Sequence, residues 1–311
     1  MSGAGAHLAR SLGLVAVGAL LAGAGTIVNG DAAITFIGGP AFSLPTGDGT
    51  LITDSGSVDQ LYKYCWYYRT PANNQNSVMS KVDVPTEVYS GDTGYFEWND
   101  AGPGATGGEH FDAQLTVHIE DRGIPGHTVA THRMWVRNAS TTTKTFQFFN
   151  LIDLDLSGTP LDDTSEGIDF STASGARVAV SEPSGRTAEC FGLAATRWEV
   201  GSGSSLRAKL SSGSQNLSNA SEPFTGDGAI AFQWTLTLAP GETRLLYGGF
   251  AIDESVPCPA DFDSNGFVNG VDVDDFLVYF MLGDPHADFD HNGFTNGDDF
   301  DLYIERFEAG C

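Results

Sequence analysis

The sequence predicts a mainly β protein, in which a large antiparallel β-sandwich is followed by a small α-helical module. Three observations support this fold class. Residues 25–250 contain stretches in which apolar and polar residues alternate with period two, as in half-buried strands. Residues 258–311 contain one motif twice, 27 positions apart. Each copy is followed by apolar residues at helical spacing. We expect residues 251–257 to be a linker between the two domains.

The N-terminal 24 residues have the pattern of a secretory signal peptide. His7 and Arg10 precede an apolar run from Leu12 to Leu21, and Ala22-Gly23-Ala24 follows as a cleavage site of small residues. The run is too short to span a bilayer, so a cleaved signal is expected rather than a membrane anchor. No later segment has eighteen consecutive apolar residues, and the mature chain is expected to be secreted or held at the cell surface.

Three segments in the large domain alternate clearly enough to be predicted as strands: residues 111–120, 146–156 and 232–238. Residues 239–242 (Ala-Pro-Gly-Glu) suit a type II turn, with Pro240 and Gly241 at its centre, leading into a return strand over residues 244–250. No amphipathic helix is expected in this domain. Many short strands rich in Gly, Ser and Thr favour a single β-sandwich.

Aromatic residues crowd one predicted strand. Tyr62, Tyr64, Trp66 and Tyr68 share one face, which is either part of the core or a flat platform for stacking a sugar. The core is the favoured alternative. Four histidines, His110, His118, His127 and His132, lie close together in sequence without the spacing of a zinc site, so they are expected at the surface.

Candidate catalytic residues are few. Asp153, Asp155, Asp162 and Asp163 cluster around residues 158–160, where two carboxylates could act as acid and base on a glycosidic bond. The alternative, a solvated acidic loop with a weak metal site, is favoured. No nucleophile-elbow, Cys-x-x-Cys or phosphate-loop motif is present. The sequence therefore predicts no catalytic residue.

Residues 133–156 resemble a hairpin found in supersandwich domains of the mutarotase-like and glycosidase-associated kind. The resemblance covers only a few dozen residues. It implies contact with carbohydrate but names no substrate.

The repeated motif near the C-terminus has the pattern of an EF-hand Ca²⁺ loop. Oxygen-bearing side chains stand at loop positions 1, 3, 5, 9 and 12, and glycine stands at position 6. The backbone carbonyl at position 7 adds a ligand, and the carboxylate at position 12 closes the shell. The expected ligands of the first ion are Asp261, Asp263, Asn265, Phe267, Asn269 and Asp272. Those of the second are Asp288, Asp290, Asn292, Phe294, Asn296 and Asp299, although Asp298 could replace its neighbour Asp299.

Each loop is followed by a short helix with one apolar stripe, and neither loop has an entry helix. The stripes consist of Phe276, Leu277, Phe280 and Met281, and of Phe300, Tyr303, Ile304 and Phe307. A loop and exit helix, occurring twice with Asp at position 12, resembles a dockerin module. The final Gly310-Cys311 resembles the variant that ends many secreted bacterial proteins. The resemblance implies folding on Ca²⁺ binding and docking onto a cohesin or cell-surface partner. The polar pair that contacts the partner in dockerins is replaced by Gly270-Val271 and Gly297-Asp298.

The four cysteines fit an oxidising compartment. Cys258 and Cys311 bracket the C-terminal module and are expected to form a disulfide. Cys65 and Cys190 either form a second disulfide, which is the favoured alternative, or remain buried free thiols. The chain's formal net charge is −25 over 311 residues. Nucleic acid and anionic membranes are therefore disfavoured as partners.

From sequence we expect a secreted, non-catalytic β-sandwich that binds a ligand or serves a structural role, attached through its C-terminal Ca²⁺-binding module. The alternative is a polysaccharide-active enzyme tethered by the same module. An enzyme should bring two or more carboxylates together in the folded sandwich, whereas a binding module should expose an aromatic strip.

Overall fold

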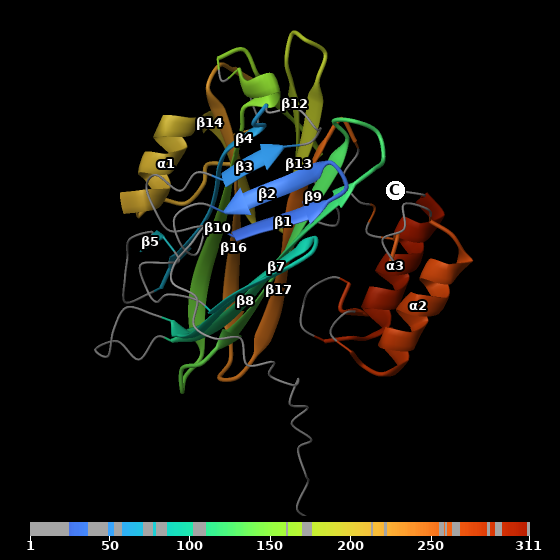
Figure 1. Ribbon diagram of the computed structural model, residues 1–311. Helices are drawn as coiled ribbons and strands as arrows, with labels where there is room; N and C mark the ends of the chain where they lie inside the picture. The colour runs from blue at the N-terminus through green and yellow to red at the C-terminus, as the bar shows by residue number, and fades with distance from the viewer. Residues whose placement is uncertain are drawn as a thin grey trace, which may run out of the picture.

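The computed structural model of the chain describes residues 25–36, 49–52, 58–70, 77–78, 86–101, 110–159, 161–169, 176–212, 214–220, 223–254, 258, 260–262, 268–284, 287–289 and 294–309. The expected signal peptide, residues 1–24, lies outside this part. Strands form the body of the molecule, and two helices form a small unit at the C-terminal end (Figure 1). In the described part of the chain, no helix is both long and apolar enough to cross a bilayer.

The first strands in chain order are β1 (Gly25–Asn29), β2 (Ala32–Phe36), β3 (Gly49–Ile52), β4 (Leu61–Arg69), β5 (Ser77–Val78), β6 (Thr86–Ser90), β7 (Thr93–Ala101), β8 (Phe111–Asp121) and β9 (Thr128–Asn138). They are followed by β10 (Lys144–Leu154), β11 (Thr164–Asp169), β12 (Ala176–Ser181), β13 (Thr187–Leu193), β14 (Arg197–Ser202), β15 (Phe224–Thr225), β16 (Gly228–Leu238) and β17 (Thr243–Ile252). The helices are α1 (Gly203–Ser212), α2 (Gly270–Met281), α3 (Gly297–Ala309) and the 3-10 turn η2 (Leu156–Gly158).

Among the described residues, the strands form three sheets. The largest has the order β15-β11-β12-β13-β17-β9-β8-β7-β6, the second β14-β16-β10-β4-β5, and the smallest β1-β2-β3. The two larger sheets pack face to face, with Trp66 of β4 against His132 of β9 and Tyr68 of β4 against Phe111 of β8. The ladders between neighbouring named strands are antiparallel. A mainly β, sandwich-like fold is therefore confirmed.

The strands with the clearest alternation are confirmed. Along β8, buried residues occupy every second position, beginning at Phe111. The expected type II turn is also present: Gly241 has φ +78°, and the Glu242 amide donates to the Ala239 carbonyl at 3.0 Å. This turn joins β16 of one sheet to β17 of the other.

The expected hairpin over residues 133–156 is wrong. β9 pairs with β8 and β17 in the nine-stranded sheet, whereas β10 pairs with β4 and β16 in the five-stranded sheet. The chain crosses between the sheets after Asn138, whose side-chain amide donates to the carbonyls of Thr142 and Leu238. Two consecutive half-buried strands predict neighbours in one sheet, but here they cover the core from opposite sides.

Helix α1 was not expected, because its Gly-Ser start and its single pair of leucines give little amphipathic signal. Leu206 and Leu210, one turn apart, are buried on the outer face of the five-stranded sheet against residues of β4 and β10. α1 therefore covers a second, smaller core at the side of the sandwich (Figure 1), and its Arg207 reaches Asp153 near the end of β10.

The aromatic face of β4 belongs to the core, as favoured, with one exception. Tyr64, Trp66 and Tyr68 are buried between the sheets, but Tyr62 is 44% exposed. The ladder between β4 and β10 shifts register between Asp153 and Leu154, so Tyr62 falls out of step with the alternation. An aromatic ring is thus left at the surface at the end of β10.

Two other expectations are corrected by burial. His132 is not a surface residue: it lies between the sheets against Tyr64 and Trp66, and burial lowers its pKa to about 3. Cys65 and Cys190 are both buried and free. They cannot pair because Cys65 belongs to the small core under α1, whereas Cys190 belongs to the core between the sheets.

The C-terminal unit consists of two similar halves, and both expected helices are present. Residues 27 positions apart occupy matching places: Ala260 and Ala287 are fully buried, as are Phe276 and Tyr303. The rings of Phe276 and Tyr303 stack at the centre, with centroids 3.9 Å apart and planes 5° apart. The unit therefore has its own small core, built from both copies of the repeat.

Candidate functional site

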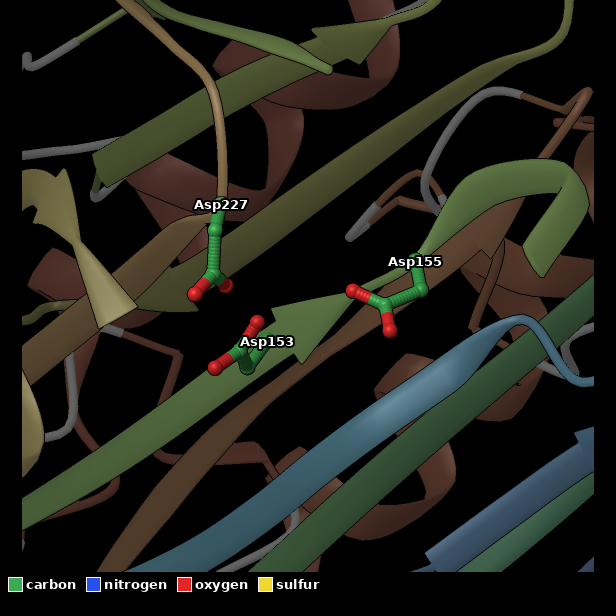
Figure 2. Close-up of side chains that lie close together, drawn as sticks. All are labelled: Asp153, Asp155 and Asp227. Carbon is green, nitrogen blue, oxygen red and sulfur yellow. The ribbon is translucent and has the colours of Figure 1, made fainter. Parts of the chain in front are cut away.

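Three aspartates from two parts of the chain come together at the end of β10. Asp153 lies on the strand, Asp155 follows it, and Asp227 lies in the turn before β16. Each offers an oxygen atom, and these atoms lie within 4.8 Å of one another. Figure 2 shows the three carboxylates pointing toward a common point. We call these residues the β10 acid cluster.

Strand pairing explains why the cluster forms. β10 and β16 are antiparallel, and their ladder ends at the pair Ile152 and Ile230. Asp155 lies three residues after the first member of that pair, and Asp227 lies three residues before the second. The two aspartates are therefore brought opposite each other where both strands leave the sheet.

Asp153 is the buried member of the cluster, with a fully covered side chain. Its Oδ2 is ion-paired with Arg207 of α1, whereas its Oδ1 is buried without a hydrogen-bond partner. Lys63, also buried, is its neighbour across the ladder with β4. The charge of Asp153 is thus compensated from α1 and from β4, and one of its oxygens remains unsatisfied.

Gly203 allows α1 to begin directly over this ion pair. Its amide donates to the Asp227 carbonyl at 3.0 Å, which ties the start of the helix to the cluster. A Cβ atom at this position would lie 2.7 Å from Asp153 Oδ2 and 2.8 Å from Arg207 Nη1. A larger residue would therefore push the helix or the ion pair out of place.

Burial makes the cluster weakly acidic. It raises the pKa of Asp153 to about 8, against the lowering effect of Arg207, and the Asp227 and Asp155 charges raise it further. Burial also raises the pKa of Asp155 to about 6, with added repulsion from Asp227 and Asp59. Two carboxyl groups in the cluster therefore hold protons at a pH where an exposed aspartate is ionised.

A cation and an aromatic ring border the cluster. The Arg207 guanidinium lies 5.1 Å from the centre of the Tyr62 ring, and the Lys63 amine lies 5.8 Å from it. Asp155 and Asp227 are partly exposed, unlike Asp153. The end of β10 thus presents two accessible carboxyl groups beside an exposed aromatic ring.

A second acidic group lies nearby, formed by Asp162, Asp163 and Glu182, with oxygen atoms also within 4.8 Å of one another. Burial raises the pKa of Asp163 to about 7, although the Leu156 amide opposes this effect. The pKa of Glu182 is lowered despite its burial, because the hydroxyls of Ser157, Ser184 and Thr159 donate to it.

The acidic loop expected from sequence is thus split into two groups. Asp153 and Asp163 are buried, so a solvated loop is the wrong description for them. Asp227 and Glu182, which complete the groups, were missed because only strand pairing brings them close. The alternation that predicted β10 and β16 was the available signal, but it did not give their register.

The expected Ca²⁺ ligands of the C-terminal unit are partly described. Asp261 and Asp288 are each 8% exposed, and Asp272 and Asp299 are fully buried. Asp272 accepts from the Asn269 amide at 2.8 Å, and Asp299 accepts from the Asn296 amide at 2.7 Å, so the halves match again. Phe294 is described with an exposed side chain. The remaining expected ligands lie outside the described residues: Asp263, Asn265, Phe267, Asp290 and Asn292.

The disulfide expected at the ends of this unit is described at one end only. Cys258 is disulfide-bonded. Cys311 lies outside the described residues. Their pairing therefore stays a prediction.

A cavity of about 470 Å³ lies elsewhere, on the outer face of the nine-stranded sheet. Arg122, Arg133 and Tyr247 line it, together with Asp261 of the C-terminal unit. No member of either acidic group borders this cavity, so it is separate from the candidate chemistry.

Comparison with known proteins gives only distant likenesses. No family model matches the chain. No curated protein matches it. Among solved structures, it is similar to a putative aldose 1-epimerase from Escherichia coli K12, with 9% identity, 74% of this chain and 98% of that chain covered, and a TM-score of 0.45.

A galactose mutarotase related enzyme from Lactobacillus acidophilus gives 8% identity, 75% and 98% coverage, and a TM-score of 0.47. A putative kojibiose phosphorylase from human microbiome gives 10% identity, 91% of this chain, 35% of that chain and a TM-score of 0.42. At these identities and scores, the likenesses assign no function.

The dockerin resemblance of residues 258–311 is corrected by these comparisons. No family model matches the chain, so none supports a dockerin module. The repeat and its two helices are present, but they do not place the chain in that family. Docking onto a cohesin or cell-surface partner is tested by none of these comparisons.

Proposed function

We propose that the β-sandwich is a sugar-active enzyme, in which Asp155 and Asp227 act as an acid–base pair at the anomeric centre of a carbohydrate. The observation that carries this proposal is the convergence of the β10 acid cluster, with two carboxyl groups accessible above a buried third.

The pair has the chemical properties that cleavage of a glycosidic bond requires. One carboxyl group must donate a proton to the leaving oxygen while the other is ionised. Asp155, whose pKa burial raises to about 6, is the proton donor in this proposal, and Asp227 is its catalytic partner. One oxygen of each lies within 4.8 Å of the other, close to the roughly 5 Å spacing of retaining enzymes. In that mechanism Asp227 would attack the anomeric carbon, and Asp155 would act first as the acid and then as the base that activates water.

The surroundings support a sugar as the substrate. The exposed ring of Tyr62 offers a flat apolar face against which a sugar ring can pack, and Arg207 offers donors for hydroxyl groups. Asp153 does not touch the substrate in this proposal. It holds Arg207 in place through their ion pair.

The test is release of reducing sugar from a polysaccharide panel, with interconversion of sugar anomers measured in parallel. Asp155→Asn and Asp227→Asn should each lower kcat about 10²–10⁴-fold, as expected for loss of acid–base catalysis. Glu166→Gln, an exposed acid on β11 outside both groups, should not change it. If the wild type and all three variants bind a glycan without turning it over, the non-catalytic binding role is favoured instead.

We also propose that the C-terminal unit binds two Ca²⁺ ions. This is supported by the matching buried carboxylates Asp261 and Asp288, and Asp272 and Asp299, because hard oxygen ligands suit Ca²⁺. In calorimetric titration of the full chain, the double variant Asp261→Ala, Asp288→Ala should bind two Ca²⁺ ions fewer than the wild type. An unchanged stoichiometry would refute it.

Secretion of the protein remains a prediction, tested by the N-terminal mass of secreted material.

A further inference from the structure

We propose that Asp162, Asp163 and Glu182 form a third Ca²⁺ site, located in the sandwich at the end of the ladder between β11 and β12. Their oxygen atoms lie within 4.8 Å of one another. This site is separate from the β10 acid cluster and from the C-terminal unit, and it does not depend on either proposal above.

Strand pairing forces two of these acids together. The β11–β12 ladder ends at the pair Thr164 and Ser181, so Asp163, just before it, faces Glu182, just after it. Like charges opposite each other on neighbouring antiparallel strands repel. Both residues are buried, with exposed fractions of 3% and 8%, which strengthens the repulsion. A bound cation would remove this cost.

Asp163 provides the second, independent observation. Both of its carboxylate oxygens are buried and have no hydrogen-bond partner that meets full hydrogen-bond geometry, although the Leu156 amide lies close enough to affect it. Buried carboxylates in folded proteins normally have partners. An acid with two unsatisfied oxygens facing another acid is arranged as a ligand for a cation.

Glu182 is held in a fixed orientation by the hydroxyl groups of Ser157, Ser184 and Thr159, which all donate to it. These donors satisfy a charged carboxylate and leave its remaining lone pairs for a metal ion. Glu182 is therefore an ionised ligand that needs no rearrangement to bind.

The donor set selects Ca²⁺. All three side chains offer oxygen, and no His or Cys belongs to the group, which disfavours zinc. Ca²⁺ accepts six to eight oxygen ligands in irregular geometry, with water completing the shell, whereas Mg²⁺ demands a near-ideal octahedron. Asp162 is exposed, so the ion has a route from solvent.

The test is calorimetric titration of the full chain with CaCl₂ at pH 8, comparing wild type with Asp163→Asn. Asn has the shape of a protonated aspartate, so the variant should fold; should it fail to do so, Glu182→Gln takes its place. The expected result is the loss of one Ca²⁺ equivalent. The matched control Glu166→Gln, an exposed acid on β11 two residues beyond the ladder end at Thr164, should keep all equivalents.

The same titration in an Asp261→Ala, Asp288→Ala background separates this site from the C-terminal unit. One equivalent should remain there and vanish when Asp163→Asn is added. Equal stoichiometry and equal Ca²⁺-induced shifts in Tm for wild type and Asp163→Asn would overturn the proposal, because Asp163 would then be neutralised by a proton alone. Binding of MgCl₂ with the same affinity as CaCl₂ would overturn the choice of ion.

Discussion

The two acid-rich regions of this protein, the C-terminal unit and the end of the sandwich at β10, concentrate negative charge in opposite ways. In the C-terminal unit, the acids of each half lie within one short loop, and the two halves repeat each other. At the end of β10, Asp153 and Asp227 are far apart in sequence and meet only because β10 pairs with β16. A local arrangement can be recognised from sequence, whereas a long-range one requires the register of the sheet.

The largest effect that would test this comparison concerns the independence of the two regions. Phe276→Ala removes a fully buried ring that stacks on Tyr303, and should destabilise the C-terminal unit by about 3–5 kcal/mol. The sandwich should be unaffected, because it has its own core. Differential scanning calorimetry should show one transition lowered and the other unchanged. A parallel shift of both would mean that the regions unfold together.

The next effect distinguishes the regions by pH. Asp153, Asp155 and Asp163 have pKa values raised to about 8, 6 and 7, above the value near 3.9 in the unfolded chain. The folded state therefore binds more protons than the unfolded state between these values. The stability they contribute is complete below about pH 4 and is lost as pH rises through 6 to 8.

The Tm of the sandwich, measured with a Ca²⁺ chelator, should therefore fall from pH 5 to pH 9. In Asp153→Asn, the free energy of unfolding should fall by roughly 2–4 kcal/mol less than in the wild type over this pH range, since each pKa unit corresponds to about 1.4 kcal/mol. Glu166→Gln serves as the control. A wild-type Tm that does not change over this range would contradict the raised pKa values.

A smaller effect tests how closely α1 covers the β10 acid cluster. Gly203→Ala would place a Cβ atom within 3 Å of both Asp153 and Arg207, so it should cost about 1–3 kcal/mol by overpacking. Chemical denaturation of the full chain measures this loss. Gly201→Ala is the matched control, because a Cβ atom at Gly201 meets nothing within 4 Å. Equal stability of the two variants would show that α1 does not rest on the ion pair.

The smallest effect tests whether the two halves of the C-terminal unit are equivalent. The side chain of Asn269 accepts from the Val271 amide at 2.9 Å, and that of Asn296 accepts from the Asp298 amide at 2.8 Å. Each is an N-cap, so Asn269→Ala and Asn296→Ala should each cost about 1 kcal/mol without Ca²⁺. Circular dichroism melts compare them. Very different losses would show that one half carries most of the stability.

The parts of the structure predicted correctly are those encoded by neighbouring residues. The alternation in residues 111–120 gave β8, and the apolar stripes gave α2 and α3. The hairpin between β9 and β10 was wrong because alternation does not say which sheet a strand joins. α1 was missed because two leucines are enough to bury a helix on an existing sheet.

The candidate site was half predicted for the same reason. Four aspartates lie near one another in the sequence between residues 153 and 163, but their division into two groups depends on η2 and on two separate ladders. Alternation with period two predicts Tyr62 on the core face, but the ladder shifts register at this position and leaves the ring exposed. Burial, which decides the proton affinity of Asp153 and Asp163, follows from those ladders and cannot be seen in sequence alone.

The stack of Phe276 on Tyr303 means that each half of the C-terminal unit covers the ring of the other. A chain with a single copy would leave that ring face in water, and only a second copy could bury it. The second copy does not have to come from the same molecule. Because the two halves offer matching surfaces, two chains at high concentration could exchange them and form a domain-swapped dimer that keeps the same core.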